Sequence, residues 1–118
     1  MDVLPKMIIY CDSSTKQACV VIEGNLPEIT TYPNSVTNNE GEYLALILAL
    51  EKASRTPNVF FEILTDSQLV VEQVNEHWAC REKRLQALRH KVWGLARNLD
   101  VEISWVPRDK NLAGKVLG

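Results

Sequence analysis

Three carboxylates stand at positions where a fold could gather them. Asp12 follows the apolar run 7–11, and Asp66 follows the nearly continuous apolar run 59–64 after a single threonine. Glu42 lies in the first turn of a predicted helix, on the face that otherwise carries small and apolar side chains. Each acid also has a purely structural interpretation, because aspartates cap turns and helices and a glutamate compensates the helix dipole.

Taken together, the three acids predict a metal site. In an open sheet, the ends of adjacent strands form a crevice where sites develop. If the strands before Asp12 and Asp66 are parallel neighbours, their carboxylates lie side by side, and a helix that crosses the sheet brings Glu42 to the same point. Crowded carboxylates have raised pKa values unless a cation neutralises them. Hard oxygen ligands of this kind suit Mg²⁺ or Mn²⁺.

The alternation of apolar runs and turn residues predicts the elements that must position these acids. Asn38 or Asn39 is expected to cap the first helix. Three strands in a meander, followed by alternating helices and strands, predict an α/β fold with a mixed five-stranded sheet in one domain, residues 1–118. The strands are predicted at 6–11, 18–23, 28–33, 59–64 and 100–106, and the helices within 37–54 and at 67–78, 82–99 and 111–117.

Composition indicates a soluble globular protein. Hydrophobic residues make up 46% of the 118 residues and charged residues 24%. No apolar run approaches the ~20 residues of a membrane span, and the first residues lack the layout of a signal peptide. The three cysteines form no metal-binding pair, which favours a reducing, cytoplasmic location over a disulfide framework.

Charge is distributed unevenly along the chain. The formal net charge of −2 does not indicate a nucleic-acid partner. However, residues 1–78 hold 4 basic and 11 acidic residues, a net of −7, whereas residues 79–118 hold 9 and 4, a net of +5. This asymmetry predicts either an anionic partner for the second part of the chain or simply a solvated helix face.

The motifs around the three acids resemble those of type 1 ribonuclease H. The matching segments are the aspartate at the end of the first strand, "TNNEGEY" with Glu42, "TDSQLVVEQV" with Asp66, and the tail "WVPRDKN". They occur in the family's order over nearly the whole chain. The resemblance implies a ribonuclease H-like α/β fold, in which three antiparallel meander strands are followed by parallel strands and helices pack on both faces.

The resemblance also implies an activity, which is hydrolysis of the RNA strand of RNA–DNA hybrids with two Mg²⁺ or Mn²⁺ ions. Asp12 would bridge both ions, and Glu42 and Asp66 would complete the coordination. Glu42 would also reach a ribose 2′-OH, the group that distinguishes RNA from DNA. No membrane and no protein partner are expected, and the protein is expected to be a monomer. Five further positions match substrate contacts of the family, and their alternative interpretation is that they cap helices or are polar surface residues. They are Thr37, Asn38, Asn39, Gln68 and Arg108.

The last helix departs from the family pattern "NxxAD". Lys115 occupies the position of the fourth carboxylate in "NLAGK". The amide oxygen of Asn111 is the first candidate to replace it as a metal ligand, although Asn111 is also the expected helix cap, and Asp109 is the second candidate. The lost charge is expected to weaken the second metal site, so that activity needs more metal or favours Mn²⁺.

Two further departures concern the substrate. Arg108 stands where many members carry a histidine, and "DSSTKQA" lacks the glycine-rich segment that helps to hold the RNA strand. The sequence therefore leaves two alternatives open. One is a ribonuclease H-like nucleic-acid-binding domain that is weakened or inactive in catalysis, which Lys115 favours. The other is a resolvase-like nuclease acting on DNA, which "TNN" and Gln68 disfavour.

Overall fold

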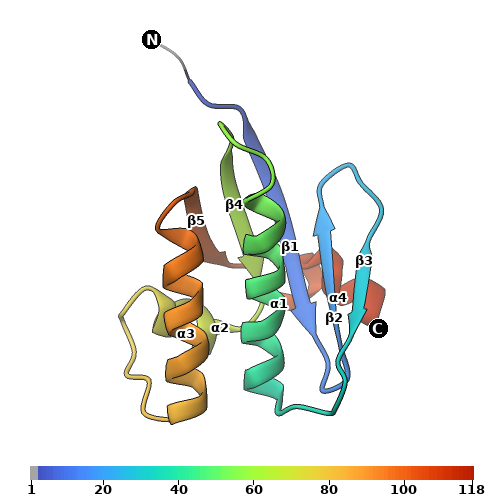
Figure 1. Ribbon diagram of the computed structural model, residues 1–118. Coiled ribbons are helices and arrows are strands. Elements are labelled where there is room, and N and C mark those ends of the chain that lie inside the picture. The colour runs from blue at the N-terminus through green and yellow to red at the C-terminus, as the bar shows by residue number, and fades with distance from the viewer. Residues whose placement is uncertain (1–2) are drawn as a thin grey trace.

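The computed structural model describes residues 3–118, so the first two residues of the expected domain lie outside the described residues. Within these described residues, five strands and four α-helices follow one another in the predicted order (Figure 1), and a short 3₁₀-helix lies where a loop was predicted. The elements are β1 (Lys6–Ser13), β2 (Gln17–Ile22), β3 (Glu28–Thr31), α1 (Asn38–Ala53), β4 (Phe60–Thr65), α2 (Gln68–Val74), α3 (Lys83–Ala96), β5 (Asp100–Trp105), η1 (Arg108–Lys110) and α4 (Leu112–Leu117).

The five strands form one mixed sheet in the order β3-β2-β1-β4-β5. The meander β1–β2–β3 is antiparallel, whereas β4 and β5 run parallel to β1. The predicted mixed sheet is therefore confirmed. The pairing of β1 with β4 brings the carboxyl ends of these two strands to the same edge, which is the condition that the carboxylate argument required.

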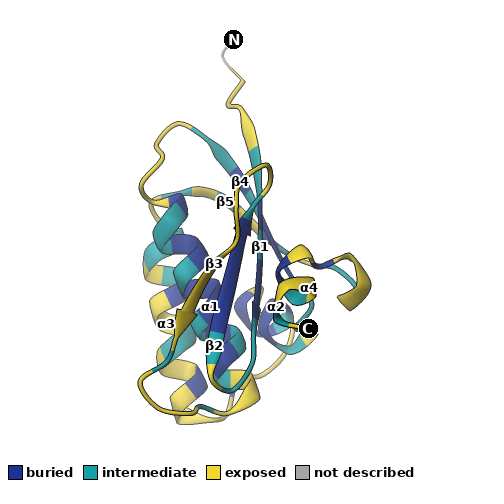
Figure 2. Cartoon of the chain, turned by 90° about the vertical axis from the view of Figure 1, so that its right-hand side faces the viewer, coloured by how far each residue is buried: buried dark blue, intermediate teal, exposed yellow. Residues whose placement is uncertain are grey.

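Helices cover both faces of the sheet, as predicted (Figure 2). Side chains of α1, α2 and α3 share one large apolar core with the strands, whereas α4 packs on the opposite face against β1 and β2. The stripe of α1 that carries Leu46, Ala49 and Ala53 is fully buried, because small side chains let the helix approach the sheet closely. A smaller apolar cluster under α4 contains Cys19 and Ala113.

The first strand is longer than predicted and contains Asp12, which pairs with Cys19 of β2. The turn that follows is short because the side chain of Ser14 accepts hydrogen bonds from the backbone N–H groups of Lys16 and Gln17. Hydrogen bonds to a serine hydroxyl thus stabilise a tight turn that contains no glycine. Asp12 is consequently held by the sheet ladder rather than by a loop.

The ends of two helices also differ from the prediction. Thr37 is the N-cap of α1, instead of Asn38 or Asn39, because its side chain accepts from the N–H of Glu40 while Glu40 accepts from the N–H of Thr37. The second helix ends four residues early, since Glu76 adopts a positive φ of 64° that a right-handed helix excludes.

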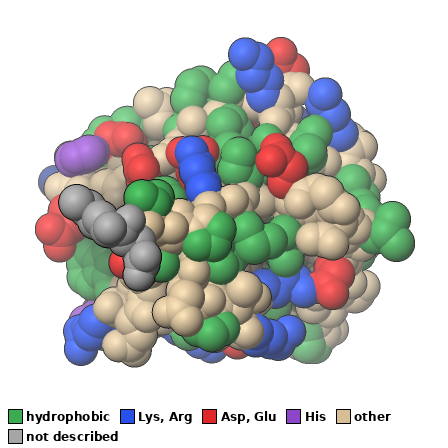
Figure 3. All heavy atoms as spheres, turned by 90° about the horizontal axis from the view of Figure 1, so that it is seen from above, with side chains coloured by type: hydrophobic (Ala, Val, Ile, Leu, Met, Phe, Trp, Pro, Cys, Tyr) green, Lys and Arg blue, Asp and Glu red, His purple; other side chains and the backbone are tan. Residues whose placement is uncertain are grey.

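No helix among residues 3–118 is both long enough and apolar enough to span a membrane. Figure 3 views the end of the molecule at which β1 begins, where basic and acidic side chains are interspersed with apolar ones. That end carries no large surface of a single charge. The carboxyl ends of β1 and β4 lie at the other end of the sheet (Figure 1).

Candidate metal centre and active site

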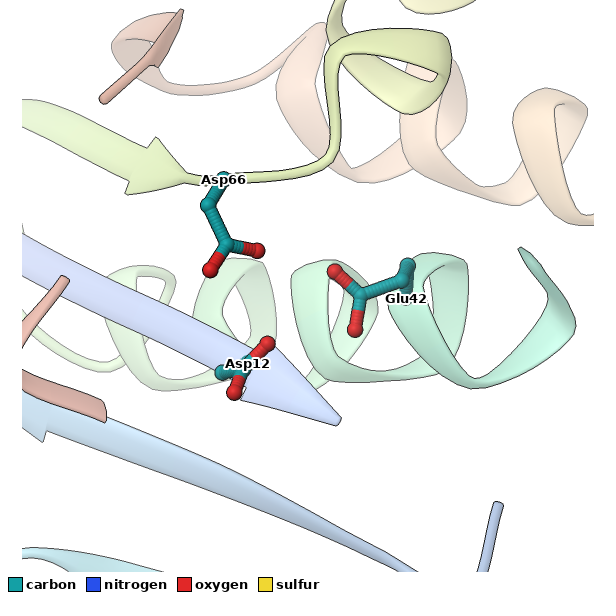
Figure 4. A group of neighbouring side chains, drawn as sticks. All are labelled: Asp12, Glu42 and Asp66. Atoms are coloured by element: carbon teal, nitrogen blue, oxygen red, sulfur yellow. The ribbon is translucent and has the colours of Figure 1, made fainter. Parts of the chain in front are cut away.

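The three predicted acids meet at the carboxyl end of the central strands. Asp12 comes from β1, Asp66 directly follows β4, and Glu42 lies in the first turns of α1. Their side chains point toward one another (Figure 4), and one carboxylate oxygen of each lies within 4.8 Å of the others. The structure therefore brings together the residues that the sequence grouped, while their role as metal ligands stays a prediction.

Asp12 lies in a confined position. Its side chain is buried, and α4 approaches it so closely that a Cβ atom at Gly114 would lie 3.2 Å from Asp12 Oδ2. Burial and the neighbouring Asp66 carboxylate raise the pKa of Asp12, against which the N–H of Ser13 and the charge of Arg108 act. Asp12 therefore has little freedom to turn away from the other acids.

Glu42 is held by the end of β1. Its Oε1 accepts a hydrogen bond of 2.9 Å from the backbone N–H of Ser13. The two elements approach closely because Gly41 has no side chain, and a Cβ atom there would lie 2.5 Å from Ser13 Oγ. Burial, followed by the charges of Asp12 and Asp66, raises the pKa of Glu42 to about 8.

These shifts follow from three carboxylates crowded into a partly desolvated site, where the charge of Arg108 opposes the rise in the Asp12 pKa without cancelling it. Desolvation and mutual repulsion both disfavour three ionised carboxylates at this distance. A divalent cation would remove the repulsion, and carboxylate oxygens are the ligands that Mg²⁺ and Mn²⁺ prefer. The donor set therefore fits a hard divalent cation.

The three acids open into a cleft of about 460 Å³. Hydroxyl groups of the β1–β2 turn line one side of it, and Arg108 from η1 lines another. Of the asparagines predicted to contact substrate, Asn38 lines this cleft. The cleft thus joins the acids to a basic side chain and to several hydrogen-bonding groups, as a site for a phosphodiester requires.

The other predicted contact residues lie outside the cleft lining. Thr37, Asn39 and Gln68 are exposed at the amino-terminal ends of α1 and α2. The capping role of Thr37, which the sequence offered as the alternative, is observed. These three residues remain available to a substrate that is larger than the cleft.

Asn111 is completely buried, and both ends of its amide are engaged. Its Oδ1 accepts from the N–H of Ala113 at 3.1 Å, as the N-cap of α4, and its Nδ2 donates to the carbonyl of Cys11 at 3.0 Å. The residue therefore ties α4 to β1 directly before Asp12. Asp109 and Lys115 are exposed and lie outside the cleft lining.

Two residues that shape the site escaped the sequence analysis. Ser13 acts through its backbone N–H, which no side-chain motif reveals. Gly114 acts through the absence of a side chain beside Asp12. A glycine inside a predicted helix is a signal for close approach, and this signal applies to both Gly114 and Gly41.

Comparison with known proteins places the chain in a family. Residues 8–117 match the family described as "Reverse transcriptase-like". The chain belongs to the reverse transcriptase-like family. Among curated proteins, the bifunctional protein Rv2228c of Mycobacterium tuberculosis is 36% identical over 76 residues, which are 64% of this chain but 21% of the relative. The chain thus matches about a fifth of that protein's length.

Several solved structures with the same fold are ribonucleases H. RNase H1 of Halobacterium salinarum NRC-1 superimposes with a TM-score of 0.82 at 29% identity, covering 95% of this chain and 93% of that one. The N-terminal RNase H domain of Rv2228c gives 0.80 at 27% identity, with 91% and 86% covered. LC11-RNase H1, solved in complex with an RNA/DNA hybrid, gives 0.79 at 25% identity, with 95% and 99% covered. The resemblance to type 1 ribonuclease H is confirmed.

Proposed function

We propose that this member of the reverse transcriptase-like family is a ribonuclease H, an endonuclease that hydrolyses the RNA strand of RNA–DNA hybrids with Mg²⁺ or Mn²⁺. One observation carries the proposal, namely the convergence of three carboxylates from separate elements within 4.8 Å in a ribonuclease H fold. Capping or dipole compensation explains each acid alone. Neither explains why their repulsion is tolerated at one point.

Asp12, Glu42 and Asp66 are the residues that would hold the metal. A pair of divalent ions, when bound, stabilises the attacking and leaving oxygens of an in-line displacement at phosphorus. The protein supplies a rigid frame for them, because the sheet ladder fixes Asp12 and the Ser13 N–H orients Glu42. Preorganised ligands of this kind lose little entropy when the cation binds.

A hybrid is the substrate that the surroundings favour. LC11-RNase H1 carries an RNA/DNA hybrid in its solved complex. In this chain, Arg108 and Asn38 line the cleft and are proposed to contact the RNA backbone beside the cut. Thr37, Asn39 and Gln68 are exposed at helix starts and are proposed to contact the backbone and the minor groove further along.

The DNA strand is assigned to the amino-terminal end of α3. An ion pair of 3.6 Å between Arg84 and Glu40 places this end beside the start of α1, at the same end of the sheet as the carboxyl ends of β1 and β4 (Figure 1). Arg81 and Lys83 are exposed there. Exposed cations that follow a phosphate backbone release counterions, so hybrid binding should weaken as salt is added.

A nucleic-acid-binding domain with weak or no catalysis is the second candidate function. The observation that favours it is Lys115, which stands where the family carries a fourth carboxylate, while the amide of Asn111 is occupied by α4 and β1. Under the first proposal, the same departure lowers the affinity of the second ion, and cleavage needs more metal or favours Mn²⁺.

A cleavage assay with a panel of end-labelled substrates tests the proposal. An RNA–DNA hybrid, a DNA duplex and an RNA duplex of the same sequence are incubated with Mg²⁺ or Mn²⁺ and either wild-type protein or Asp12→Asn. We expect the wild type to cut only the RNA strand of the hybrid, at internal positions, and the variant to lose this activity by at least about a thousandfold.

Other outcomes discriminate among the alternatives. Hybrid binding without cleavage in either metal would support the inactive binding domain. Cutting of the DNA duplex would support a DNA nuclease. Equal cleavage by wild type and Asp12→Asn would trace the activity to a contaminant and refute the proposed site.

A further inference from the structure

We infer that Tyr32 is a positioning residue for Glu42 and acts through the end of β1. The inference rests on the proposed function, because it assigns Tyr32 to the same metal site. Tyr32 directly follows β3, between Asp12 and Glu42 in the sequence, and its side chain is neither acidic nor basic. Its hydroxyl nevertheless joins the two elements that meet at Glu42.

The backbone fixes Tyr32 against the β1–β2 turn. Its N–H donates a hydrogen bond of 2.9 Å to the carbonyl of Lys16, and four residues later the N–H of Val36 donates to the carbonyl of Thr15 at 2.9 Å. The segment from Tyr32 to Val36 is thus anchored across the turn. The half-buried ring carries the hydroxyl from this anchor toward the start of α1.

The hydroxyl of Tyr32 makes two contacts that bridge strand and helix. It accepts a hydrogen bond of 2.7 Å from Ser13 Oγ, and it donates its single proton to the carbonyl of Gly41 at 3.2 Å. Ser13 supplies the N–H that binds Glu42 Oε1 at 2.9 Å, and Gly41 is the residue before Glu42. One hydroxyl therefore restrains both sides of the Ser13–Glu42 hydrogen bond.

The other partners of Ser13 Oγ do not substitute for this link. They are the carbonyls of Ser14 at 2.6 Å and Gln17 at 3.2 Å, both within the β1–β2 hairpin. The Ser13 hydroxyl has one proton, so these carbonyls are alternative acceptors to Tyr32 within the turn, and neither of them reaches α1. Among the described residues, the Tyr32 hydroxyl is the partner of Ser13 Oγ that also reaches α1.

The test compares Tyr32→Phe, which keeps the ring and removes the bridge, with Tyr10→Phe as a matched control. Tyr10 is also half-buried and lies on β1, but it packs against the small cluster under α4. Mn²⁺ affinity is measured by titration calorimetry without any substrate, and thermal unfolding is measured without metal. A merely structural tyrosine would change the unfolding temperature but not the Mn²⁺ affinity of the folded protein.

We expect Tyr32→Phe to bind Mn²⁺ about fivefold more weakly than the wild type, which corresponds to the loss of one ordinary hydrogen bond, and Tyr10→Phe to bind it normally. Ser13→Ala keeps the N–H donor to Glu42 and removes the hydroxyl partner. Because both variants break the same bridge, the double variant should lose no more affinity than Tyr32→Phe alone. Unchanged Mn²⁺ affinity in Tyr32→Phe would overturn the inference.

The design separates this inference from the proposed function. A wild type that binds Mn²⁺ but cuts no hybrid contradicts the proposed function. In that case the role of Tyr32 is still tested by comparing the Mn²⁺ affinities of the wild type and Tyr32→Phe. A wild type that cuts the hybrid, with equal Mn²⁺ affinity in Tyr32→Phe, contradicts the inference alone. A wild type that binds no Mn²⁺ contradicts both.

Discussion

The protonation of Glu42 depends strongly on the fold. Its pKa is raised to about 8, first by burial and then by the charges of Asp12 and Asp66, from an ordinary value of 4.5. Between these two values the folded protein binds a proton that the unfolded chain has released. The free energy of unfolding, measured without divalent ions, should therefore fall as the pH rises from about 5 to 8.

Urea unfolding at pH 5, 6.5 and 8 in the presence of a chelator measures this dependence. Glu42→Gln cannot ionise, so the variant should lose much of the fall and should be more stable than the wild type at pH 8. If the variant shows the same pH dependence as the wild type, the charge of Glu42 is not the cause.

Asn111 offers a second test at the residue scale. Replacement by alanine removes the cap of α4 and the hydrogen bond to the carbonyl of Cys11, both of them fully buried. We expect Asn111→Ala to lose about 2 kcal/mol of stability in urea unfolding. We expect its Mn²⁺ affinity to stay within about twofold of the wild type, because the amide oxygen is engaged by the N–H of Ala113 rather than directed at the metal site. A loss of affinity beyond tenfold would instead identify Asn111 as a ligand.

At the scale of elements, the contact between β1 and α1 depends on Gly41. A Cβ atom at this position would lie 2.5 Å from Ser13 Oγ and 2.9 Å from the carbonyl oxygen of Ser14. Gly41→Ala should therefore push α1 away from the strand and destabilise the protein by about 1–3 kcal/mol. Urea unfolding measures the loss, and calorimetry should show weaker Mn²⁺ binding as well.

Gly94 provides the matched control for this substitution. It lies within α3, and a Cβ atom there would meet nothing within 4 Å. Gly94→Ala should stabilise the protein by about 0.5–1 kcal/mol, because alanine favours the helix. Equal effects of the two substitutions would show that helix propensity, rather than the approach of β1, controls the result at Gly41.

The elements themselves were largely predictable from sequence. Apolar periodicity predicted the mixed sheet and the helices, and the run 59–64 predicted the buried parallel strand beside β1. The positions of Asp12 and Asp66 at strand ends then followed. What periodicity cannot predict is a hydrogen bond between distant residues, such as that between Tyr32 and Ser13. The convergence of the three acids was therefore predictable, and the contacts that orient them were not.

At the scale of the whole molecule, basic residues at the two ends of the sheet allow the proposed binding surface to be tested. Arg81 and Lys83 lie at the start of α3, beside the cleft end of α1, whereas Lys6 begins β1 at the opposite end of the sheet. If the hybrid follows α3, each phosphate contact contributes roughly one unit to the slope of log affinity against log salt.

Fluorescence anisotropy with a labelled hybrid measures this slope in an Asp12→Asn background, which prevents cleavage. Adding Arg81→Ala and Lys83→Ala should reduce its magnitude by about two units. Lys6→Ala also removes one positive charge, but at the opposite end of the sheet, and should leave the slope unchanged. Equal effects at both ends would indicate that net charge, rather than the α3 surface, governs binding.

The central claim is that Asp12, Glu42 and Asp66 act as one unit that supports hydrolysis of the RNA strand. The most direct measurement is the single-turnover rate of hybrid cleavage in Mn²⁺ for the wild type, Asp12→Asn, Asp66→Asn and the double variant. Groups that act together are strongly non-additive. Each single variant should therefore lose at least about a thousandfold, and the double variant little more than either. A double variant whose losses multiply, or a wild type no faster than Asp12→Asn, would contradict the account.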